Sequence, residues 1–442
     1  MLTPLLVIIS LILLLTFPSL SQPHILPLTA YKTPSTSLPR PPNKLHFHHN
    51  ITLTVSLQVG TPPQNITMVL DTGSELSYLN CNLTRPHNLN LTQPFFNRTL
   101  STTYATVPCD SPTCTNRTSD LTIPASCDPT RQVCHAMLSY ADMSSAEGDL
   151  ASDTFHVGNL DVSDTVFGCM VSGSSTNPVE DAKTNGLLGM NRGSLSFISQ
   201  MGLRKFSYCI STGLNEPGVL LLGDDENVTA WLGLGYKVPL NYTPLVRISD
   251  PLPYYNRVAY TVQFKGIKVG DKILDLPESL LQPDHTGAGQ TMVDSGTQFS
   301  ILLGPAYTVL RSEFYNQTQH ILRDLGEPDY TFAGVMDLCY RVPHNQTVLP
   351  DLPSVTLLFE GADMRVSGPD RLLYRVPGEK RENDTVYCFT FGNSDLLGAE
   401  AYIIGHHHQQ NVWMEFDLEK SRMGLAPLEC DLAVQKLGLS YK

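Results

Sequence analysis

The sequence predicts a mostly β protein built from two lobes, and three observations support this class. The chain has 442 residues, which is too long for one ordinary hydrophobic core and suits two domains of typical size. Short alternating or apolar segments, separated by Gly, Pro and Asn, run along most of it and are typical of strands. One turn motif also occurs twice, once in each half.

The strand segments recur in both halves. Clear examples are ITLTVSLQV at residues 51–59, NITMVLD at 65–71, VAYTVQF at 258–264 and SVTLLFE at 354–360. Each is seven to nine residues long and bounded by residues that favour turns, as is common for strands. We therefore expect sheets to dominate both lobes.

Helical signals are few. The best covers residues 304–322, where Pro305 suits a first helical turn. A shorter helix is expected at residues 194–202, opened by Ser194 as a cap and closed by Gly202. The apolar face of the longer helix consists of Ala306, Val309, Leu310 and Phe314.

Residues 1–21 have the pattern of a cleaved signal peptide. An apolar run from Leu5 to Phe17 precedes the small residues Ser19 and Ser21. Because no Lys or Arg precedes the run, a short membrane anchor is the alternative. No other stretch approaches the roughly 20 apolar residues that span a bilayer, so we expect no membrane span after signal removal.

Residues 22–50 are Pro-rich, basic and without periodicity. We expect an extended leader here, with folding beginning near Ile51. Lys32, Arg40 and Lys44 supply cations that an acidic cleft would bind before activation. The leader is therefore either an inhibitory prosegment or a disordered linker.

Composition argues against a nucleic-acid partner. The formal net charge is −13, whereas contacts to phosphates need clustered Lys and Arg. The sequence also holds no Ser nucleophile elbow, no H-E-x-x-H motif and no P-loop.

Cysteines and sequons indicate the secretory pathway, ending outside the cell or in an endomembrane lumen. The ten cysteines contain no C-x-x-C pair, so disulfides are favoured over structural zinc. The polar tail, residues 431–442, has neither an ER-retention signal nor a lipid-anchor pattern, and ER residence without such a signal stays open. Glycosylation sequons occur at Asn50, Asn65, Asn82, Asn90, Asn97, Asn116, Asn227, Asn241, Asn316, Asn345 and Asn383.

The repeated motif indicates internal duplication. Its copies are MVLDTGSELSYL at residues 68–79 and TMVDSGTQFSIL at 291–302. At a nearly equal distance beyond each copy lies an apolar-apolar-Gly segment, ending at Gly189 or Gly405. The expected domains are an N-terminal lobe at residues 51–249 and a C-terminal lobe at 250–430, with the junction near 250–255.

The repeated turn places one acid in each lobe. Asp71 and Asp294 follow apolar residues that fit a buried strand, and Gly73 and Gly296 let the two loops approach closely because they have no Cβ. Two carboxylates about 3 Å apart cannot both ionise cheaply, so they share a proton. Such a pair provides a general base for a bound water and a general acid for a substrate oxygen.

Hydroxyl side chains flank both acids. We expect them to bind the backbone of the facing loop and so to fix the two carboxylates. They are Thr72 and Ser74 in the first copy, and Ser295 and Thr297 in the second.

With these motifs the chain resembles the pepsin-type aspartic proteases over about residues 51–430. The resemblance implies a bilobal double β-barrel with a few short helices, and an active site in the cleft between the lobes. It implies that Asp71 and Asp294 are the catalytic pair, that Thr72 and Ser295 lock the loops, and that the substrate is a peptide or protein. We expect activity on the acid side, a monomer, and no cofactor or metal.

Within that family, the runs PRPPNKLHFHHN, VDSGTQFSILLGP and IIGHHHQQN resemble the plant nepenthesin-like proteases of the promotion-of-cell-survival type. The resemblance also implies five disulfides. These are Cys81–Cys169, Cys109–Cys134, Cys114–Cys127, Cys209–Cys430 and Cys339–Cys388, and the stapled segment would be an insert on the first lobe.

The resemblance implies a flap over the substrate, with Tyr140 as its closing aromatic residue. Ala141 and Met143 replace two glycines that are usual in such flaps, so we expect a stiffer hairpin tip. Tyr78 stands where the family commonly has Trp. The hydroxyl of Tyr is also a hydrogen-bond donor, but it lies at a different distance from the backbone than the indole N–H of Trp. The alternative for Tyr140 is an ordinary strand aromatic.

The run His406–His408 does not suggest a metal site. Consecutive residues on an extended strand point to alternate sides, so three in a row rarely converge on one ion. We expect a solvent-facing or pH-sensitive patch beside the Gly405 turn.

Two other functions compete with proteolysis. The same plant fold includes inhibitors of glycan-degrading enzymes, which are binding proteins and commonly lose part of the catalytic motif, whereas both motifs are intact here. A glycosidase would also use two carboxylates, but the twin glycine turns would then have no purpose.

Overall fold

The structure is a computed structural model that describes residues 23–32, 51–81, 95–174, 183–213, 216–224, 239–346 and 348–439. The expected signal peptide, Arg40, Lys44 and the sequons at Asn50, Asn82, Asn90 and Asn227 lie outside these residues. Among the helices of the described residues, none is long and apolar enough to cross a membrane.

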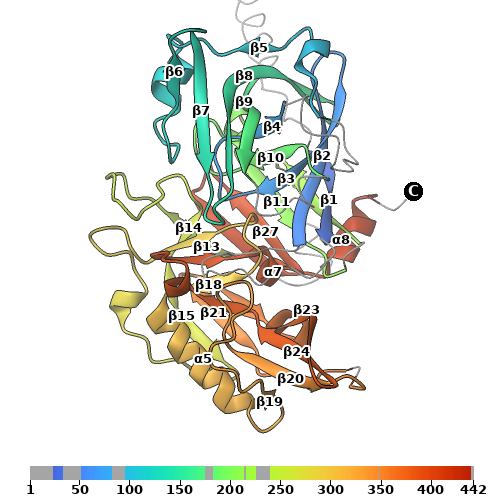
Figure 1. Ribbon diagram of the computed structural model, residues 1–442, viewed down its shortest axis with the longest axis vertical. Coiled ribbons are helices and arrows are strands. Elements are labelled where there is room, and N and C mark those ends of the chain that lie inside the picture. The colour runs from blue at the N-terminus through green and yellow to red at the C-terminus, as the bar shows by residue number, and fades with distance from the viewer. Residues whose placement is uncertain are drawn as a thin grey trace, which may run out of the picture.

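The chain forms two mostly β lobes, which confirms the predicted fold class. The lobe coloured blue to green lies above the lobe coloured yellow to orange in Figure 1. Within the described residues, one 20-stranded sheet runs through both lobes, and two four-stranded sheets, β16-β15-β21-β22 and β19-β20-β24-β23, complete the C-terminal lobe.

The first part of the chain supplies strands β1 to β13. They are β1 His24–Lys32, β2 Ile51–Val59, β3 Gln64–Asp71, β4 Tyr78–Asn80, β5 Ala105–Thr106, β6 Ser126–Asp128, β7 Val133–Ser139, β8 Ser145–Val157, β9 Leu160–Ser174, β10 Gly186–Gly189, β11 Lys205–Cys209, β12 Pro217–Leu222 and β13 Asn241–Val246.

The second part supplies strands β14 to β28. They are β14 Thr261–Val262, β15 Phe264–Val269, β16 Lys272–Ile273, β17 Gln290–Val293, β18 Ser300–Leu302, β19 Arg323–Asp324, β20 Cys339–Pro343, β21 Val355–Phe359, β22 Ala362–Val366, β23 Leu373–Arg381, β24 Asp384–Phe389, β25 Phe391–Asn393, β26 Ala401–Ile404, β27 Val412–Asp417 and β28 Arg422–Pro427.

A run of antiparallel strands joins the lobes. In space its order is β1, β12, β11, β27, β28 and β13, so strands from the two ends of the sequence alternate with strands from its middle. Phe206 of β11 stacks on Phe416 of β27 with ring centroids 4.6 Å apart. This shared layer fixes one lobe relative to the other, and the position of the site depends on it.

Ordered structure does not begin near Ile51, so that expectation is wrong. Residues 24–32 form β1, which pairs with β12 through residues 24–29 and with β2 through residues 28–32. Leu26, Leu28 and Ala30 are buried, while the residues between them are exposed. This part of the expected leader is therefore an integral strand of the sheet.

The duplication appears as two matching strand arrangements. In the first, β10 lies parallel to β3, with Gly189 beside Asp71, and antiparallel to β4. In the second, β26 lies parallel to β17 and antiparallel to β18. Each arrangement delivers its motif Asp at the end of a buried strand.

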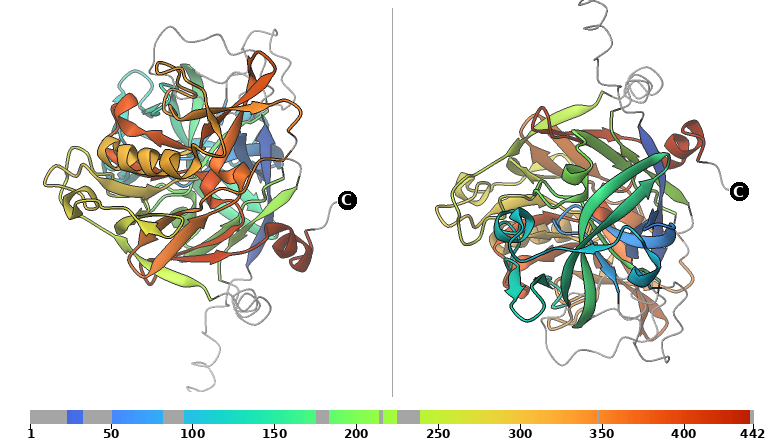
Figure 2. Two further views of the ribbon diagram at one scale, coloured as in Figure 1. Left: turned by 90° about the horizontal axis from the view of Figure 1, so that it is seen from below. Right: turned by 90° about the horizontal axis from the view of Figure 1, so that it is seen from above.

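Helices are few and mostly short within the described residues. The helix predicted at residues 304–322 is confirmed as α5, Gly304–Thr318, with Pro near its start, and it covers the outer side of the C-terminal lobe (Figure 2). The shorter one is α3, Phe197–Gln200, and its cap is Ser196 rather than Ser194. The others are α6 Pro369–Leu372, α7 His406–Gln409, α8 Cys430–Lys436, and the single turns η1 Arg98–Leu100, η2 Thr113–Arg117, η3 Glu278–Leu280 and η4 Ser394–Leu396.

The tail is less polar than expected. Ala433 and Val434 of α8 are buried against β12 and β27, in a cluster with Val219, Leu221 and Trp413. The bridge between Cys209 and Cys430 ties this helix to β11.

Two predicted disulfides are wrong. The structure joins Cys109 to Cys127 and Cys114 to Cys134, not Cys109 to Cys134 and Cys114 to Cys127. The pairing follows burial, because Cys114 and Cys134 are both buried in a small cluster whereas Cys127 is exposed. The bridges Cys81–Cys169, Cys209–Cys430 and Cys339–Cys388 are as predicted.

Candidate active site

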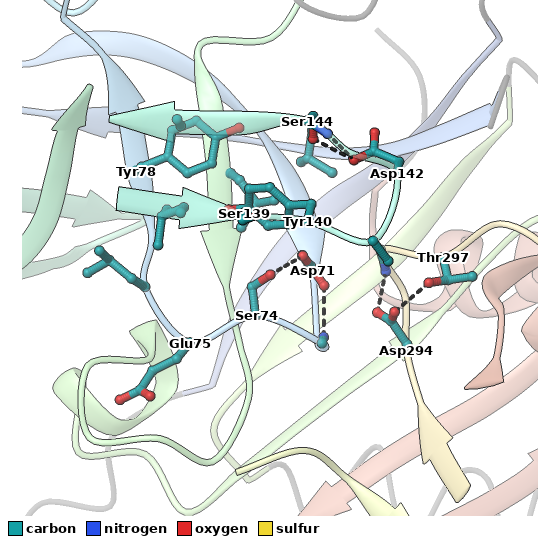
Figure 3. Close-up of a pocket in the computed structure, with 18 of the residues that line it drawn as sticks. Asp71, Ser74, Glu75, Tyr78, Ser139, Tyr140, Asp142, Ser144, Asp294 and Thr297 are labelled. Carbon is teal, nitrogen blue, oxygen red and sulfur yellow. Dashed lines mark hydrogen bonds between the residues drawn. The ribbon is translucent and has the colours of Figure 1, made fainter. Parts of the chain in front are cut away.

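The two motif aspartates lie at the floor of the cleft between the lobes, each held by its own loop (Figure 3). One oxygen of Asp71 accepts the Gly73 N–H at 2.8 Å, and its other oxygen accepts the Ser74 hydroxyl. Asp294 accepts the Gly296 N–H at 2.8 Å and the Thr297 hydroxyl at 2.6 Å. The two loops thus orient their carboxylates in the same way.

The loops are also locked to each other across the lobes. The Thr72 N–H donates to the Ser295 hydroxyl oxygen at 3.0 Å, and the Ser295 N–H donates to the Thr72 hydroxyl oxygen at 2.9 Å. The Ser295 hydroxyl in turn donates to the Leu70 carbonyl at 2.9 Å. Thr72 and Ser295 are buried, so water does not compete for these bonds.

Each motif glycine faces the aspartate of the opposite loop. A Cβ at Gly73 would lie 2.7 Å from an oxygen of Asp294, and a Cβ at Gly296 would strike the carboxylate of Asp71. In both cases the added Cβ would lie closer to the carboxylate than van der Waals contact allows. The close approach that glycine allows is therefore what brings the two carboxylates together.

We expect Gly296→Ala to reduce kcat/KM by about 10²-fold or more, because the added methyl group displaces the Asp71 carboxylate. Gly398→Ala is the control, since nothing lies within 4 Å of a Cβ there, although its φ of +67° adds modest strain. Peptide-cleavage kinetics of both variants check this expectation. Equal activity of the Gly296 variant and the wild type would contradict it.

The carboxylates influence each other electrostatically. Burial raises the pKa of Asp71, and the nearby charge of Asp294 raises it further, while the bonds from Ser74 and Gly73 oppose the shift. A raised pKa means that the pair keeps one proton until the pH rises through that value. The pair therefore holds one acid and one anion over a broad range of pH.

Two buried serines that the sequence analysis did not single out support the loops from below. The Ser77 hydroxyl accepts the Gly189 N–H at 3.0 Å, and the Ser300 hydroxyl accepts the Gly405 N–H at 3.0 Å. Both serines lie six residues after their Asp, so superposing the two motif copies would have found them.

A hairpin of β7 and β8 covers the site and carries Tyr140. The rings of Tyr140 and Tyr78 lie 6.4 Å apart between centroids, and Figure 3 shows Tyr140 between Tyr78 and Asp71. Burial raises the pKa of the Tyr140 hydroxyl well above its ordinary value, so the group stays a proton donor. At the tip, Met143 has φ 70°, a conformation that the usual glycine adopts without strain.

The cleft has a volume of about 410 Å³ and its lining is acidic. No Lys or Arg lines it among the described residues. Besides the catalytic candidates, its acidic residues are Glu75, Asp120 and Asp142. The cleft is long enough to run from the flap to both catalytic loops, as an extended peptide requires.

The prediction of a solvent-facing histidine patch is wrong. His406, His407 and His408 form the start of α7 and are buried. His408 lies between the hydroxyls of Ser300 and Thr390, at 2.7 and 2.9 Å. The chain turns into a helix directly after Gly405, so the alternation of an extended strand does not apply. Burial lowers the pKa of His407 to about 4.

Comparison with known proteins identifies the family. Models named for the N-terminal and C-terminal parts of xylanase inhibitors match residues 53–224 and 259–427. Aspartic proteinase PCS1 of Arabidopsis thaliana is 61% identical over 420 residues, which cover 94% of this chain and 89% of that protein. The chain belongs to the plant nepenthesin-like aspartic proteases. Aspartic proteinase nepenthesin-2 of Nepenthes gracilis is 28% identical and covers 85% of this chain and 77% of its own.

Solved structures of other proteins share the fold of this aspartic protease. Conglutin gamma from lupine seeds has a TM-score of 0.62 at 20% identity, covering 91% of this chain and 94% of its own. Basic 7S globulin from soybean has a TM-score of 0.61 at 20% identity, covering 91% and 96%. At this identity the likeness shows the fold, while the relatives of known activity show that the protein is an aspartic endopeptidase.

Proposed function

We propose that Asp71 and Asp294 are the catalytic pair of this endopeptidase and that they hydrolyse peptide bonds with water as the nucleophile. The observation that carries the proposal is the matched setting of the two carboxylates, each bound by its own loop and each facing the glycine of the other. No other pair of acids in the cleft has such a twofold arrangement among the described residues.

Because Asp71 and Asp294 share one proton, one of them acts as a base while the other acts as an acid. The ionised carboxylate removes a proton from water while the water oxygen bonds to the carbonyl carbon, and the protonated carboxyl gives its proton to the carbonyl oxygen. The tetrahedral intermediate then collapses. One hydroxyl returns its proton to a carboxylate, the peptide nitrogen takes a proton from the other carboxyl, and the C–N bond breaks.

We propose that Tyr140 and Tyr78 form the roof of the same site. Tyr140 lies on the flap beside the catalytic loop, and burial keeps its hydroxyl protonated and able to donate a hydrogen bond. Tyr78 supports it from the strand that follows the first motif. Thr72 and Ser295 keep the two halves of the site in register.

An inhibitor without catalytic activity is the second candidate, because the matching family models carry that name. The intact acids, glycines and hydroxyls argue against it, since a pure binding protein has no use for a pair of coupled carboxylates. Peptide hydrolysis is therefore the function that the site supports better.

Cleavage of a denatured protein substrate at a series of pH values tests this choice. We expect cleavage on the acid side, falling as the pH rises through the raised pKa of Asp71 because the pair then loses its shared proton. Pepstatin should suppress the cleavage, and peptide products are measured by mass spectrometry. Absence of cleavage at every pH would favour the inhibitor.

We further propose a monomer of the secretory pathway, with the lobes divided near residue 250. The five disulfides fit an oxidising compartment. The sequon residues that are described lie at the surface, where glycan addition needs them. Asn65, Asn116, Asn241, Asn316, Asn345 and Asn383 are exposed, and Asn97 is half-buried.

A further inference from the structure

A third acid, Glu75, belongs to the loop that carries Asp71. It follows Asp71 by four residues, lines the floor of the cleft and is only 5% exposed. In Figure 3 its carboxyl group points away from Asp71. It is therefore not a member of the catalytic pair, and the peptide hydrolysis described above does not use it.

Glu75 helps to tie this loop to the segment that runs on from β10. The Met190 N–H donates to the Asp71 carbonyl at 2.8 Å, and the Asn191 N–H donates to the Ser74 carbonyl at 3.1 Å. In a side-chain bond, the Leu195 N–H donates to Oε1 of Glu75 at 2.9 Å. The position of the loop thus depends partly on the Glu75 carboxyl.

The surroundings of this carboxyl favour its neutral form. Oε2 of Glu75 is buried and has no hydrogen-bond partner among the described residues, and no ion pair to Glu75 is found there. Gly193 packs so closely against the carboxyl that a Cβ there would clash with it. An ionised carboxylate without a partner in such a place is costly, whereas the protonated acid is not.

Few charged groups act on Glu75. Arg117 and Asp120 are the neighbours whose charges affect it, with opposite effects. The guanidinium of Arg117 donates to the Ser194 carbonyl at 2.5 Å, and Asp120 pairs with Arg257 at 2.5 Å. On its own loop, Asp71 is the nearest acid along the chain. Burial is the largest effect and raises the pKa of Glu75 to about 7, while the backbone N–H groups of Leu195 and Ser194 oppose the shift.

The second lobe holds a neutral side chain at the matching position. Superposing DTGSELS on DSGTQFS pairs Glu75 with Gln298, which is fully buried. Oε1 of Gln298 also accepts a backbone N–H, that of Ile51, at 3.3 Å. An amide performs this role at every pH, whereas the acid in the first lobe performs it without a buried charge only when protonated.

We propose that Glu75 is a positioning residue for Asp71 that acts in its protonated form, so that its ionisation loosens the first catalytic loop and lowers turnover near neutral pH. The inference rests on the proposed catalytic role of Asp71. The upper pH limit of activity then depends on the ionisation of Glu75 as well as on that of the catalytic pair.

Glu75→Gln tests this directly, because glutamine has the shape of the protonated acid and keeps the acceptor for Leu195. With the carboxyl about three-quarters ionised at about pH 7.5 in the wild type, the ratio of kcat/KM at about pH 7.5 to that at about pH 5 should rise about fourfold in the variant. The unfolding temperature should also fall less between these two pH values. Glu419→Gln, a change at an exposed acid paired with Arg204, is the control and should alter neither measurement.

Glu75→Leu removes the acceptor and should lower kcat at every pH with little change in KM. If Glu75→Gln reproduces the wild-type pH dependence of both kcat/KM and the unfolding temperature, the proposal is wrong and the catalytic pair alone sets the limit. The unfolding measurement needs no catalysis. Failure of the proposed catalytic role would therefore leave the thermal effect of Glu75→Gln in place, and the two failures can be told apart.

Discussion

Replacing either Asp71 or Asp294 by asparagine is expected to lower kcat/KM by about 10³-fold or more. Each change removes one proton acceptor from a mechanism that needs a base and an acid together, and each such group contributes about 10²–10⁴-fold. Asparagine keeps the volume and one acceptor oxygen, so the loop bonds from Gly73 or Gly296 can persist. Cleavage of a quenched fluorescent peptide measures the loss.

The fold of these variants should remain intact. The pKa of Asp71 is higher in the folded protein than in the unfolded chain, so its contribution to stability is present at low pH and is lost as the pH rises through the raised value. At neutral pH, Asp71→Asn should therefore be at least as stable as the wild type in thermal unfolding. Retained peptide cleavage in a well-folded variant would reject the assignment of the pair.

The second large effect is expected from Leu28→Asp in β1. Leu28 is 1% exposed and lies where β1 pairs with both β2 and β12. A buried carboxylate without a partner costs on the order of 3–5 kcal/mol, a large part of a total stability of about 5–15 kcal/mol. We expect little folded protein to be secreted, as measured by yield and by the unfolding temperature of what is recovered.

Thr29→Asp is the matched control, because Thr29 is the next residue of the same strand and is exposed. It introduces the same charge without burying it, so yield and stability should stay close to those of the wild type. If both variants behave alike, β1 is not part of the folded core, and residues 24–32 belong to an extended leader outside it.

The parts of the site predicted from sequence are those with strong local signals. The twin motifs contain the acids, the glycine turns and the locking hydroxyls within a few residues, and the duplication implies that the two copies meet. Long-range features were harder to predict. The alternation of β1 is visible in HILPLTAYK, but Pro27 and the basic surroundings suggested a leader. The structure accommodates Pro27 because it pairs only with β12, so no second neighbour needs its missing N–H.

The sequence does not predict the pairing of the insert cysteines or the burial of the Glu75 carboxyl, because both depend on contacts between distant segments. Spacing does not distinguish nested from interleaved bridges, and the choice depends on which cysteines are buried together. Glu75 looks like an ordinary polar residue in a turn. Only the approach of Gly193 and Leu195 from far along the chain shows that its carboxyl is enclosed.

The two interleaved bridges of the insert have a consequence for a protease. Every peptide bond from Cys109 to Cys134 lies within at least one of the bridges Cys109–Cys127 and Cys114–Cys134. This segment brings Asp120 and Leu121 to the cleft. A single break in its backbone would therefore leave both new ends attached to the protein.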